Sequence, residues 1–541
     1  CIRAGKTVAV KGLGGYHLAC NAADESAVRR LRERKQRYER PFAVMLRGLG
    51  EARRYCEVSE EEAALLVSWR KPIVLLRQRG DARLAPSVAP DNRRLGVMLP
   101  YTPLHCLLLE ENPALVLTSG NISDRPMLYR DADAATGFAA LADAVLAHDR
   151  PIVRRVDDSV FVVSLGGPRP LRRARGWAPE PLPLPDATRA ILAMGAQQKS
   201  TFCLAKDGQA FVSSHMGDLD DPETETEFLR EIASMRRLFS VEPEAVACDL
   251  HPDYASARIA RETGLPLIRV QHHRAHFASV LAEHGAGGPA LGFIWDGTGY
   301  GDDGTVWGGE TLFGTIARSE RIGHILPFRL PGGEAAVREP WRAALSVCDL
   351  ARGRGEAVRL FPARADEAAL LLQAADAGLN APLTTSMGRF FDAVAALTGL
   401  HETASYEGQA AVELEQAADE SEPDRYRFSI ARRPDGWVYD WRPVVRAILR
   451  DRTEGVPASR ISTRFHRALA YLLVDAAEAH RLGTGCPLVA LSGGCFQNEL
   501  LLALGADELR ARGFTVLINR LVPCNDGGIS YGQAAIAALQ K

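Results

Sequence analysis

The chain has 541 residues, which is too long for one compact core at roughly 150 residues per domain. Hydrophobic residues make up 46% of it and charged residues 24%, an ordinary globular mixture that excludes disordered and collagen-like chains. The 65 Lys and Arg residues nearly balance the 67 Asp and Glu residues, leaving a formal net charge of -2. No overall field therefore favours nucleic acid or an anionic membrane, although a local basic groove stays compatible with this balance. No apolar run approaches the roughly 20 residues of a membrane-spanning helix, so we expect no membrane partner.

The ten cysteines are thinly scattered and form no C-x-x-C pair; the closest two, Cys486 and Cys495, are nine residues apart. Structural zinc ribbons and fingers need closely paired cysteines, so this pattern excludes them. Scattered cysteines in a large chain fit a reducing compartment, and we expect a cytoplasmic protein. The chain opens at Cys1 without an initiator Met or a signal peptide, which predicts a piece of a longer protein.

A domain boundary is visible where four prolines stand at alternate positions within 179–185. Alternating prolines favour an extended, semi-rigid segment. We therefore predict two domains, residues 1–178 and 187–541, joined by a proline-rich linker at 179–186.

Short apolar runs alternate with helical stretches in the first domain. Residues 7–10 are typical of a strand and lead into a glycine turn at 11–15. Residues 24–37 predict a helix, because acids occupy its first turn and bases its last, as the helix dipole favours. Residues 72–76 and 114–117 are typical of buried strands, so the domain is predicted to be α/β.

Cations gather where the predicted first helix ends, at Lys35, Arg37 and Arg40, and we expect Pro41 to end that helix. Such a cluster could clamp a triphosphate, but a solvated basic face is the commoner explanation. Residues 118–121 follow a buried strand, at the position where α/β sheets bind ligands. Two further charged clusters precede the linker: Arg154, Arg155, Asp157, Asp158 and Ser159, then Arg172, Arg173 and Arg175.

The second domain opens with a hairpin signal. Apolar runs at 201–205 and 210–212 flank an Asp-Gly turn. A similar arrangement returns at 291–295, with a second strand near 311–313. The repetition suggests a duplicated nucleotide-binding half-fold; the alternative is two unrelated hairpins in one large α/β domain.

The sharpest local feature of the chain is a histidine pair, His272 and His276, which follows a predicted strand at 266–270. A helix through 277–283 would place both imidazoles on one face, where two of them can grip one metal ion. No Glu follows the first His, so the zinc-protease pattern H-E-x-x-H is not met. The alternative is a pair of polar helix residues bonded to neighbouring loops.

Carboxylates in glycine turns would complete such a site. Asp296 and Asp526 both precede glycines, which let a backbone approach a phosphate or a metal closely. Two imidazoles with two carboxylates suit Zn²⁺ or Fe²⁺, whereas each Asp alone is more simply a turn residue. The loop 492–494, followed by Asn498, could accept a ribose or phosphates on its N–H groups, although Ser-Gly-Gly also occurs in plain loops.

These motifs together resemble known families over nearly the whole chain. Residues 1–178 resemble the YrdC-like carbamate-adenylating domain through residues 11–20, Lys35, Arg37, Pro41, 119–121 and 157–159. Residues 187–541 resemble the transferase domain of the tRNA threonylcarbamoyl synthases, of the actin/Hsp70/sugar-kinase (ASKHA) superfold. The matching segments are 272–276, 295–310, 388–392, 406–409, 492–494 and 525–528.

The two domains in this order, with residues 338–342 in the second, are similar to the HypF family of carbamoyltransferases, which mature [NiFe]-hydrogenases. The resemblance implies an α/β chain in which a YrdC-like domain precedes a duplicated ASKHA domain. It also implies that carbamate attacks ATP to give carbamoyl-adenylate, with Mg²⁺ as the ATP counterion. The carbamoyl group then passes to the C-terminal cysteine of a partner, HypE, to supply the cyanide ligands.

The resemblance also implies roles for individual residues. Catalysis would fall to Lys35, Arg37, His272, His276 and Asp296, and a Zn²⁺ or Fe²⁺ ion would be held by His272, His276, Asp296 and Asp526. The predicted nucleotide-binding residues are Lys11, Lys35, Arg37, Ser119, Asn121, Ser159, Arg173, Gly297, Asp392, Gly493, Gly494 and Asn498.

The sequence departs from the full-length family pattern in two ways. It lacks the acylphosphatase-like domain and the cysteine-rich zinc region, so we expect it not to release carbamate from carbamoyl phosphate. Arg40 stands where the family usually has Lys, which keeps the charge. Three alternatives remain: a small-molecule O-carbamoyltransferase, whose transferase domain comes first; a tRNA threonylcarbamoyl enzyme; and a non-catalytic nucleotide-sensing scaffold, in which the His pair and Asp526 would be dispensable.

Overall fold

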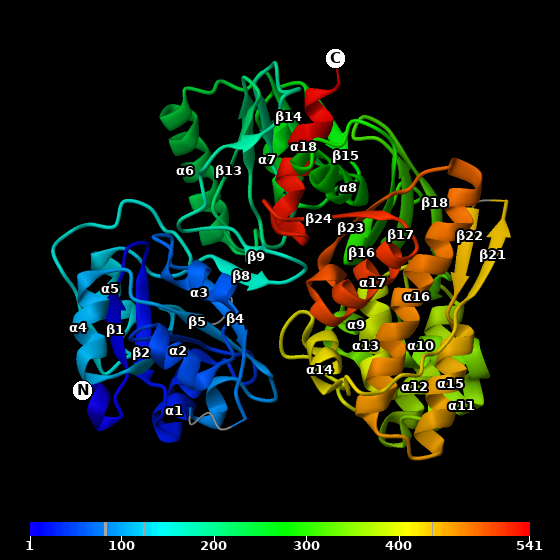
Figure 1. Ribbon diagram of the computed structural model, residues 1–541, viewed down its shortest axis with the longest axis horizontal. Helices are drawn as coiled ribbons and strands as arrows, with labels where there is room; N and C mark the ends of the chain where they lie inside the picture. Colours follow the sequence, from blue (N-terminus) through cyan, green and yellow to red (C-terminus); the bar gives the residue numbers. More distant parts are fainter. Residues whose placement is uncertain (81–83, 123–124, 435, 541) are drawn as a thin grey trace.

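The computed structural model describes residues 1–80, 84–122, 125–434 and 436–540 (Figure 1). An α/β domain, blue to cyan in Figure 1, is followed by a larger domain, green to red, that contains two further sheets. Among the described residues, no helix combines the length and the apolar character that crossing a bilayer requires.

The first domain is built on a nine-stranded mixed sheet. In order across the sheet, its strands are β7 (Ala144–Leu146), β1 (Val8–Lys11), β2 (Tyr16–Asn21), β6 (Ala114–Ser119), β3 (Ala43–Leu46), β5 (Arg94–Met98), β4 (Ile73–Arg77), β8 (Val160–Val163) and β9 (Pro168–Arg172). Its α-helices are α1 (Glu25–Lys35), α2 (Leu49–Tyr55), α3 (Glu60–Val67), α4 (Pro103–Glu111) and α5 (Asp131–Gly137). The strands predicted at 7–10, 72–76 and 114–117 are confirmed as β1, β4 and β6.

The predicted first helix is present but shorter than expected. Asp24 caps α1 by accepting a hydrogen bond from the backbone of Ala27, and the helix ends at Lys35 because Gln36 adopts a left-handed conformation (φ 52°). The prediction that Pro41 ends this helix is therefore wrong. The buried Arg32 guanidinium instead shapes the following loop, since it donates to the carbonyls of Arg37, Tyr38 and Arg40.

The proline-rich segment 179–186 is extended, but it is packed into the second domain and is not a free spacer. Strand β10 (Leu182–Pro183) pairs with β13 at the edge of a sheet. Leu182 and Leu184 lie between the alternating prolines. Both leucines are buried in the core of the second domain. Apolar burial therefore fixes a segment that the prolines alone would leave exposed.

The two sheets of the second domain share one topology. The first contains β10, β13 (Gln209–Val212), β12 (Cys203–Lys206), β11 (Ile191–Ala193), β14 (Ala245–Asp249) and β15 (Leu267–Val270), in that order. The main path of the second runs β21 (Ser429–Arg433), β22 (Gly436–Asp440), β18 (Ser319–Ile325), β17 (Val306–Gly314), β16 (Ala290–Tyr300), β23 (Leu488–Ser492) and β24 (Thr515–Ile518), with β19 (Phe328–Arg329) and β20 (Leu383–Thr384) beside it.

Strands β11–β15 and strands β16–β18, β23 and β24 follow the same order, third-second-first-fourth-fifth. In each set the first three strands pair antiparallel, and the first, fourth and fifth pair parallel. Both predicted hairpins are present but are not equivalent in the two sets: β12–β13 is formed by the second and third strands of its set, and β16–β17 by the first and second strands of its set. The predicted duplication is thus confirmed, and the domain has the ASKHA architecture.

Helices fill the space around these sheets (Figure 1). They are α6 (Pro222–Phe239), α7 (Ala255–Glu262), α8 (His272–Glu283), α9 (Ala335–Arg338), α10 (Pro340–Arg352), α11 (Arg354–Arg359), α12 (Ala365–Asp376), α13 (Met387–Leu397), α14 (Gln409–Ala417), α15 (Arg442–Thr453), α16 (Ala458–Thr484), α17 (Glu499–Ala511) and α18 (Ile529–Ala538). The last helix, α18, returns to the first half of the domain and packs against α8, whose apolar residues share a buried cluster with it.

The contact between α8 and α18 depends on a glycine. A Cβ atom on Gly532 would lie 1.9 Å from the carbonyl oxygen of Ala275, so only glycine allows this approach. The helices are therefore packed backbone to backbone, which fixes the start of α8 relative to the segment before α18.

Replacing Gly532 with Ala should destabilise the protein by about 2 kcal/mol, because overpacking a tight contact typically costs ~1–3 kcal/mol. Gly483→Ala is the matched control, since a Cβ there meets nothing within 4 Å and Ala favours a helix over Gly. Denaturant unfolding of both variants provides the measurement. Equal unfolding midpoints for the two variants would contradict the packing described.

Candidate active site

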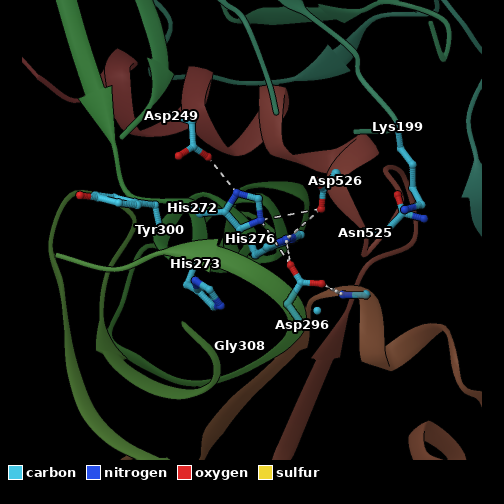
Figure 2. A network of polar contacts seen from close by, with 12 residues as sticks. Lys199, Asp249, His272, His273, His276, Asp296, Tyr300, Gly308, Asn525 and Asp526 are labelled. Carbon is cyan, nitrogen blue, oxygen red and sulfur yellow. Dashed lines mark hydrogen bonds and ion pairs between the residues drawn. The ribbon is translucent and has the colours of Figure 1, made fainter. Parts of the chain in front are cut away.

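Four ionisable side chains from distant parts of the chain converge between the halves of the second domain (Figure 2). They are His272 and His276 on α8, Asp296 in β16 and Asp526 in the short 3-10 helix η5 (Asp526–Gly528), and one ligand atom from each lies within 4.8 Å of all the others. Nε2 of His272 lies 3.3 Å from Asp296 Oδ2 and 3.7 Å from Asp526 Oδ1. The sequence predicted that these four would meet, and the structure brings them together.

A third carboxylate, Asp249 at the end of β14, orients the first histidine. Its Oδ2 lies 2.8 Å from Nδ1 of His272, and both side chains are fully buried. Nδ1 therefore donates to Asp249, which turns Nε2 toward Asp296 and Asp526. Burial alone would lower the pKa of His272, but the hydrogen bonds to Asp249 and Asp296 outweigh it and raise that pKa well above the ordinary histidine value.

The carboxylate of Asp296 is held from two sides. Its Oδ2 faces both imidazoles, at 3.3 Å from His272 Nε2 and 3.2 Å from His276 Nε2. Its Oδ1 accepts a hydrogen bond of 2.9 Å from the backbone of Gly494. Gly493, just before it, has φ 101°, and a Cβ there would lie 2.2 Å from the carbonyl oxygen of Trp295. This close approach explains why the loop after β23 requires glycine.

The two carboxylates of the cluster respond differently to burial. Burial opposes ionisation of Asp296, but the bonds from His272 and His276 prevail and hold its pKa well below the usual value. For Asp526, burial dominates and the neighbouring Asp296 adds to it, raising the pKa to about 6. Lys199 lies beside Asp526 and opposes this rise (Figure 2). The site thus concentrates the negative charge of two carboxylates, and the neighbouring histidines and Lys199 offset it.

The remaining residues predicted to bind nucleotide in this domain make the following contacts. Gly494 bonds to Asp296, and Asn498 caps α17 while its Nδ2 lies 2.9 Å from His466 Nε2. The carbonyl of Gly297 accepts a hydrogen bond from Ser386, which caps α13. Asp392, on the same helix, is buried and paired with Arg389 at 3.0 Å.

In the first domain, a second group of predicted residues is brought together at the end of β6. Nζ of Lys35 donates to the backbone carbonyl of Ser119 at 2.6 Å, and to the carbonyl and Oδ1 of Asn121 at 2.5 and 3.1 Å. The Ser119 hydroxyl also bonds Asn121 Oδ1 at 2.6 Å. Lys35 is 1% exposed, so this ammonium is a preorganised charge and not a solvated one.

The other two basic residues of the prediction have different surroundings. Arg37 extends along the loop after α1, where it donates to the carbonyl of Pro41 and stacks over the Phe42 ring at 5.2 Å. Lys11 is buried and pairs with Asp131 at 2.7 Å while donating to the carbonyl of His148.

Ser159 and Arg173 are used in structural contacts. The Ser159 hydroxyl binds the backbone of Ala174 and Arg175, and the Arg173 guanidinium donates to the carbonyls of Val212, Trp177 and Glu180. Arg173 is 2% exposed, so its donors are committed to the junction between the domains. Both residues therefore make structural contacts, and their predicted contact with a nucleotide stays a prediction.

Two residues of the site escaped the sequence reasoning, namely Asp249 and Lys199. Asp249 ends a buried strand and precedes His251 and Pro252, a position at which a carboxylate often faces a ligand. Lys199 follows β11 and carries no pattern that marks it. Together with Asp249, the four convergent ligands have the composition and the burial of a site that could hold Zn²⁺ or Fe²⁺.

Fold and site together define a class: a YrdC-like domain followed by an ASKHA-type transferase domain with a histidine–carboxylate cluster. Three family models match in the same arrangement. Residues 1–174 match the Sua5/YciO/YrdC model described as "Telomere recombination", residues 186–283 the "HypF Kae1-like domain", and residues 292–533 the "Carbamoyltransferase, Kae1-like Domain, second subdomain".

Curated proteins and solved structures extend this match over the whole chain. The chain is 41% identical to carbamoyltransferase HypF2 of Cupriavidus necator and 43% identical to carbamoyltransferase HypF of Rhodobacter capsulatus, in each case over 99% of this chain and 72% of the relative. A crystal structure of full-length HypF in the phosphate- and nucleotide-bound form superposes with a TM-score of 0.96 at 44% identity, covering 99% of this chain and 85% of that one. The chain therefore belongs to the HypF family of carbamoyltransferases.

Replacing Asp249 with Asn should weaken the binding of a divalent ion by about 10- to 100-fold, the usual effect of losing a carboxylate behind a histidine ligand. Co²⁺ titration of the metal-free protein, followed by its visible absorption, gives the affinity. Asp253→Asn is the control, because Asp253 lies exposed in the loop that follows Asp249. Equal Co²⁺ affinities in the two variants would show that Asp249 does not support a metal ligand.

Proposed function

We propose that this chain forms carbamoyl-adenylate in its first domain and transfers the carbamoyl group to a cysteine thiol in its second. The acceptor is the C-terminal cysteine of HypE, and the product is the precursor of the cyanide ligands of [NiFe]-hydrogenases. One observation carries the proposal: a buried cluster of two histidines and two aspartates adjoins a glycine loop in a chain of the HypF family.

In the first step, a carbamate oxygen attacks the α-phosphorus of ATP, forming the carbamoyl-adenylate anhydride and releasing pyrophosphate with its Mg²⁺. We propose that the buried ammonium of Lys35, which donates to Ser119 and Asn121 in this structure, supplies positive charge to the phosphates. Arg37 adds a guanidinium on the neighbouring loop. Fixed cations stabilise developing charge without the reorganisation that water would need.

In the second step, the acceptor thiolate attacks the carbamoyl carbon, and the bond to the AMP oxygen breaks. A Zn²⁺ or Fe²⁺ ion on His272, His276, Asp296 and Asp526 would draw charge from the AMP phosphate and so improve AMP as a leaving group. The Gly494 N–H donates to Asp296 in this cluster, and we propose that Asn498 and Asp392 contact the adenosine. A thiolate is a strong nucleophile and needs only modest activation.

Lys35→Met should slow ATP–pyrophosphate exchange by about 10²- to 10³-fold, the usual effect of removing one preorganised electrostatic donor. The measurement is carbamate-dependent incorporation of labelled pyrophosphate into ATP. Lys206→Met is the control, because Lys206 lies at the surface end of β12, in the other domain. Similar exchange rates in the two variants would contradict the proposal that the first domain is the adenylating site.

His276→Ala should abolish carbamoyl transfer and leave ATP–pyrophosphate exchange intact, because the two reactions occupy different domains. HypE is incubated with the chain, ATP, Mg²⁺, bicarbonate and ammonia. The mass of HypE is then measured to detect an added carbamoyl group. His284→Ala serves as the control, since His284 caps the far end of the same helix. Loss of exchange together with transfer in H276A would argue against two separate sites, and unchanged transfer would exclude the cluster from the reaction.

A further inference from the structure

The first domain reaches into the second through one hairpin, formed by β8 and β9. Its register pairs Val163 with Pro168 and Val162 with Arg169. Because β9 is the last strand of the nine-stranded sheet, its outer edge has no neighbouring strand in that sheet. The hairpin contacts two loops of the second domain, residues 493–498 and 519–526.

Arg169 is the buried centre of this contact. It is 2% exposed, and its guanidinium donates to Glu499 Oε1 at 2.6 Å and to the carbonyl of Phe496 at 2.9 Å. Phe496 in turn stacks on Trp295, with ring centroids 5.5 Å apart and planes 17° apart. Trp295 directly precedes Asp296. The planar guanidinium of Arg169, which donates to two acceptors, thus links the loop after β23 to the first domain.

The tip of the hairpin is clamped from the other loop. Arg520 donates to the carbonyls of Ser164 and Gly167 at 3.0 and 2.9 Å and to that of Leu165 at 2.5 Å. The Leu165 side chain packs against the main apolar core of the second domain. The hairpin is therefore anchored at its tip and at its middle, and it cannot shift without moving both loops.

A chain of hydrogen bonds leads from the edge of β9 to the cluster itself. The carbonyl of Leu171 accepts from Asn525 Nδ2 at 3.0 Å, and the same Nδ2 lies 2.8 Å from Gln497 Oε1. Gln497 Nε2 donates to the carbonyl of Gly494 at 3.2 Å, and the Gly494 N–H donates to Asp296 at 2.9 Å. Asn525 is also the residue before Asp526. Along this chain Asp296 is four hydrogen bonds from the first domain, and Asp526 directly follows Asn525, which is one hydrogen bond from it.

We infer that the β8–β9 hairpin of the adenylating domain is a positioning element of the transferase site, with Arg169 as its principal positioning residue. Arg169 holds the loop whose Gly494 orients Asp296, and Leu171 holds Asn525 and thereby Asp526. The inference rests on the proposed function in that it takes the cluster to be a metal site. It means that the second domain does not have a complete site without the first.

The test compares Arg169→Met and Arg169→Lys with Arg77→Met in the full chain. Arg77 is the matched control, because it also bridges the domains, to Glu420 at 3.4 Å, but in an ion pair whose side chains are both more than half exposed. Three measurements are made on each variant: Co²⁺ affinity, ATP–pyrophosphate exchange, and hydrogen–deuterium exchange of the backbone amides in residues 493–498 and 524–528. In the unsubstituted chain, several of these amides donate to protein acceptors.

Arg169→Met should weaken Co²⁺ binding by about 10- to 100-fold, as loss of support around a metal ligand does, and should speed amide exchange in both loops. Arg169→Lys keeps the positive charge but loses the planar guanidinium that donates to two acceptors, so an intermediate effect on Co²⁺ binding and amide exchange is expected. ATP–pyrophosphate exchange should stay unchanged in both variants. Co²⁺ affinity and amide exchange equal to those of Arg77→Met would overturn the inference. If the Met variant does not fold, the Lys variant decides by the same criteria.

Failure of the proposed metal site has a different signature. If the unsubstituted chain does not bind Co²⁺, the metal site in the proposed function is wrong. Amide exchange alone then tests whether the hairpin positions the two loops. Unchanged protection of both loops in the Arg169 variants would overturn it, and loss of protection would support it.

Discussion

Two carboxylates within a few ångströms of each other, one buried and one partly buried, need positive charge nearby. The effective cost of burying an unpaired ion is several kcal/mol, and Asp296 and Asp526 share one small site. In this structure the imidazoles of His272 and His276 face both carboxylates, and their hydrogen bonds to Asp296 hold the pKa of that carboxyl well below its usual value. The pKa of Asp526 is correspondingly raised. The arrangement around the cluster follows from this requirement: a backbone N–H on Asp296, Asp249 behind His272, and Lys199 beside Asp526.

The duplicated fold explains how such a site can be assembled from residues so far apart in sequence. Asp249 and the histidines belong to the first half of the second domain, whereas Asp296 lies within β16 and Gly494 follows β23, two strands of the second half. Asp526 comes from the segment that leads back to the first half through α18. The site is therefore assembled from strands of both sheets together with α8. The glycine contact between α8 and α18 then sets the distance between the histidines and Asp526, because backbone packed on backbone leaves no room for adjustment.

Much of this could be predicted from sequence because it rests on local signals. The Asp-Gly turn at 207–208, the capped first helix and the histidine pair each depend on residues a few positions apart. What the sequence could not predict depends on partners far along the chain. Leu182 is buried only because β13 accepts the linker as a strand, and Arg173 is a junction residue only because carbonyls such as that of Val212 lie opposite it. Asp249 resembles any aspartate after a strand until His272 is placed against it.

Noncovalent contacts between the domains connect the two proposed sites, in addition to the polypeptide chain that joins them. The loop after α1, which follows Lys35, carries Glu39, whose carboxylate accepts hydrogen bonds from Ser405 and Gln409 at the start of α14. Glu407, between them, pairs with Lys199, which lies beside Asp526. α14 faces the first domain in Figure 1. A mixed anhydride of carbamate is short-lived in water, so a step that makes it and a step that consumes it benefit from sites that move little relative to each other. These links are exposed or partly buried, whereas the contacts of Arg169 in the β8–β9 hairpin on the other side are buried; together they restrict that motion more than a flexible linker would.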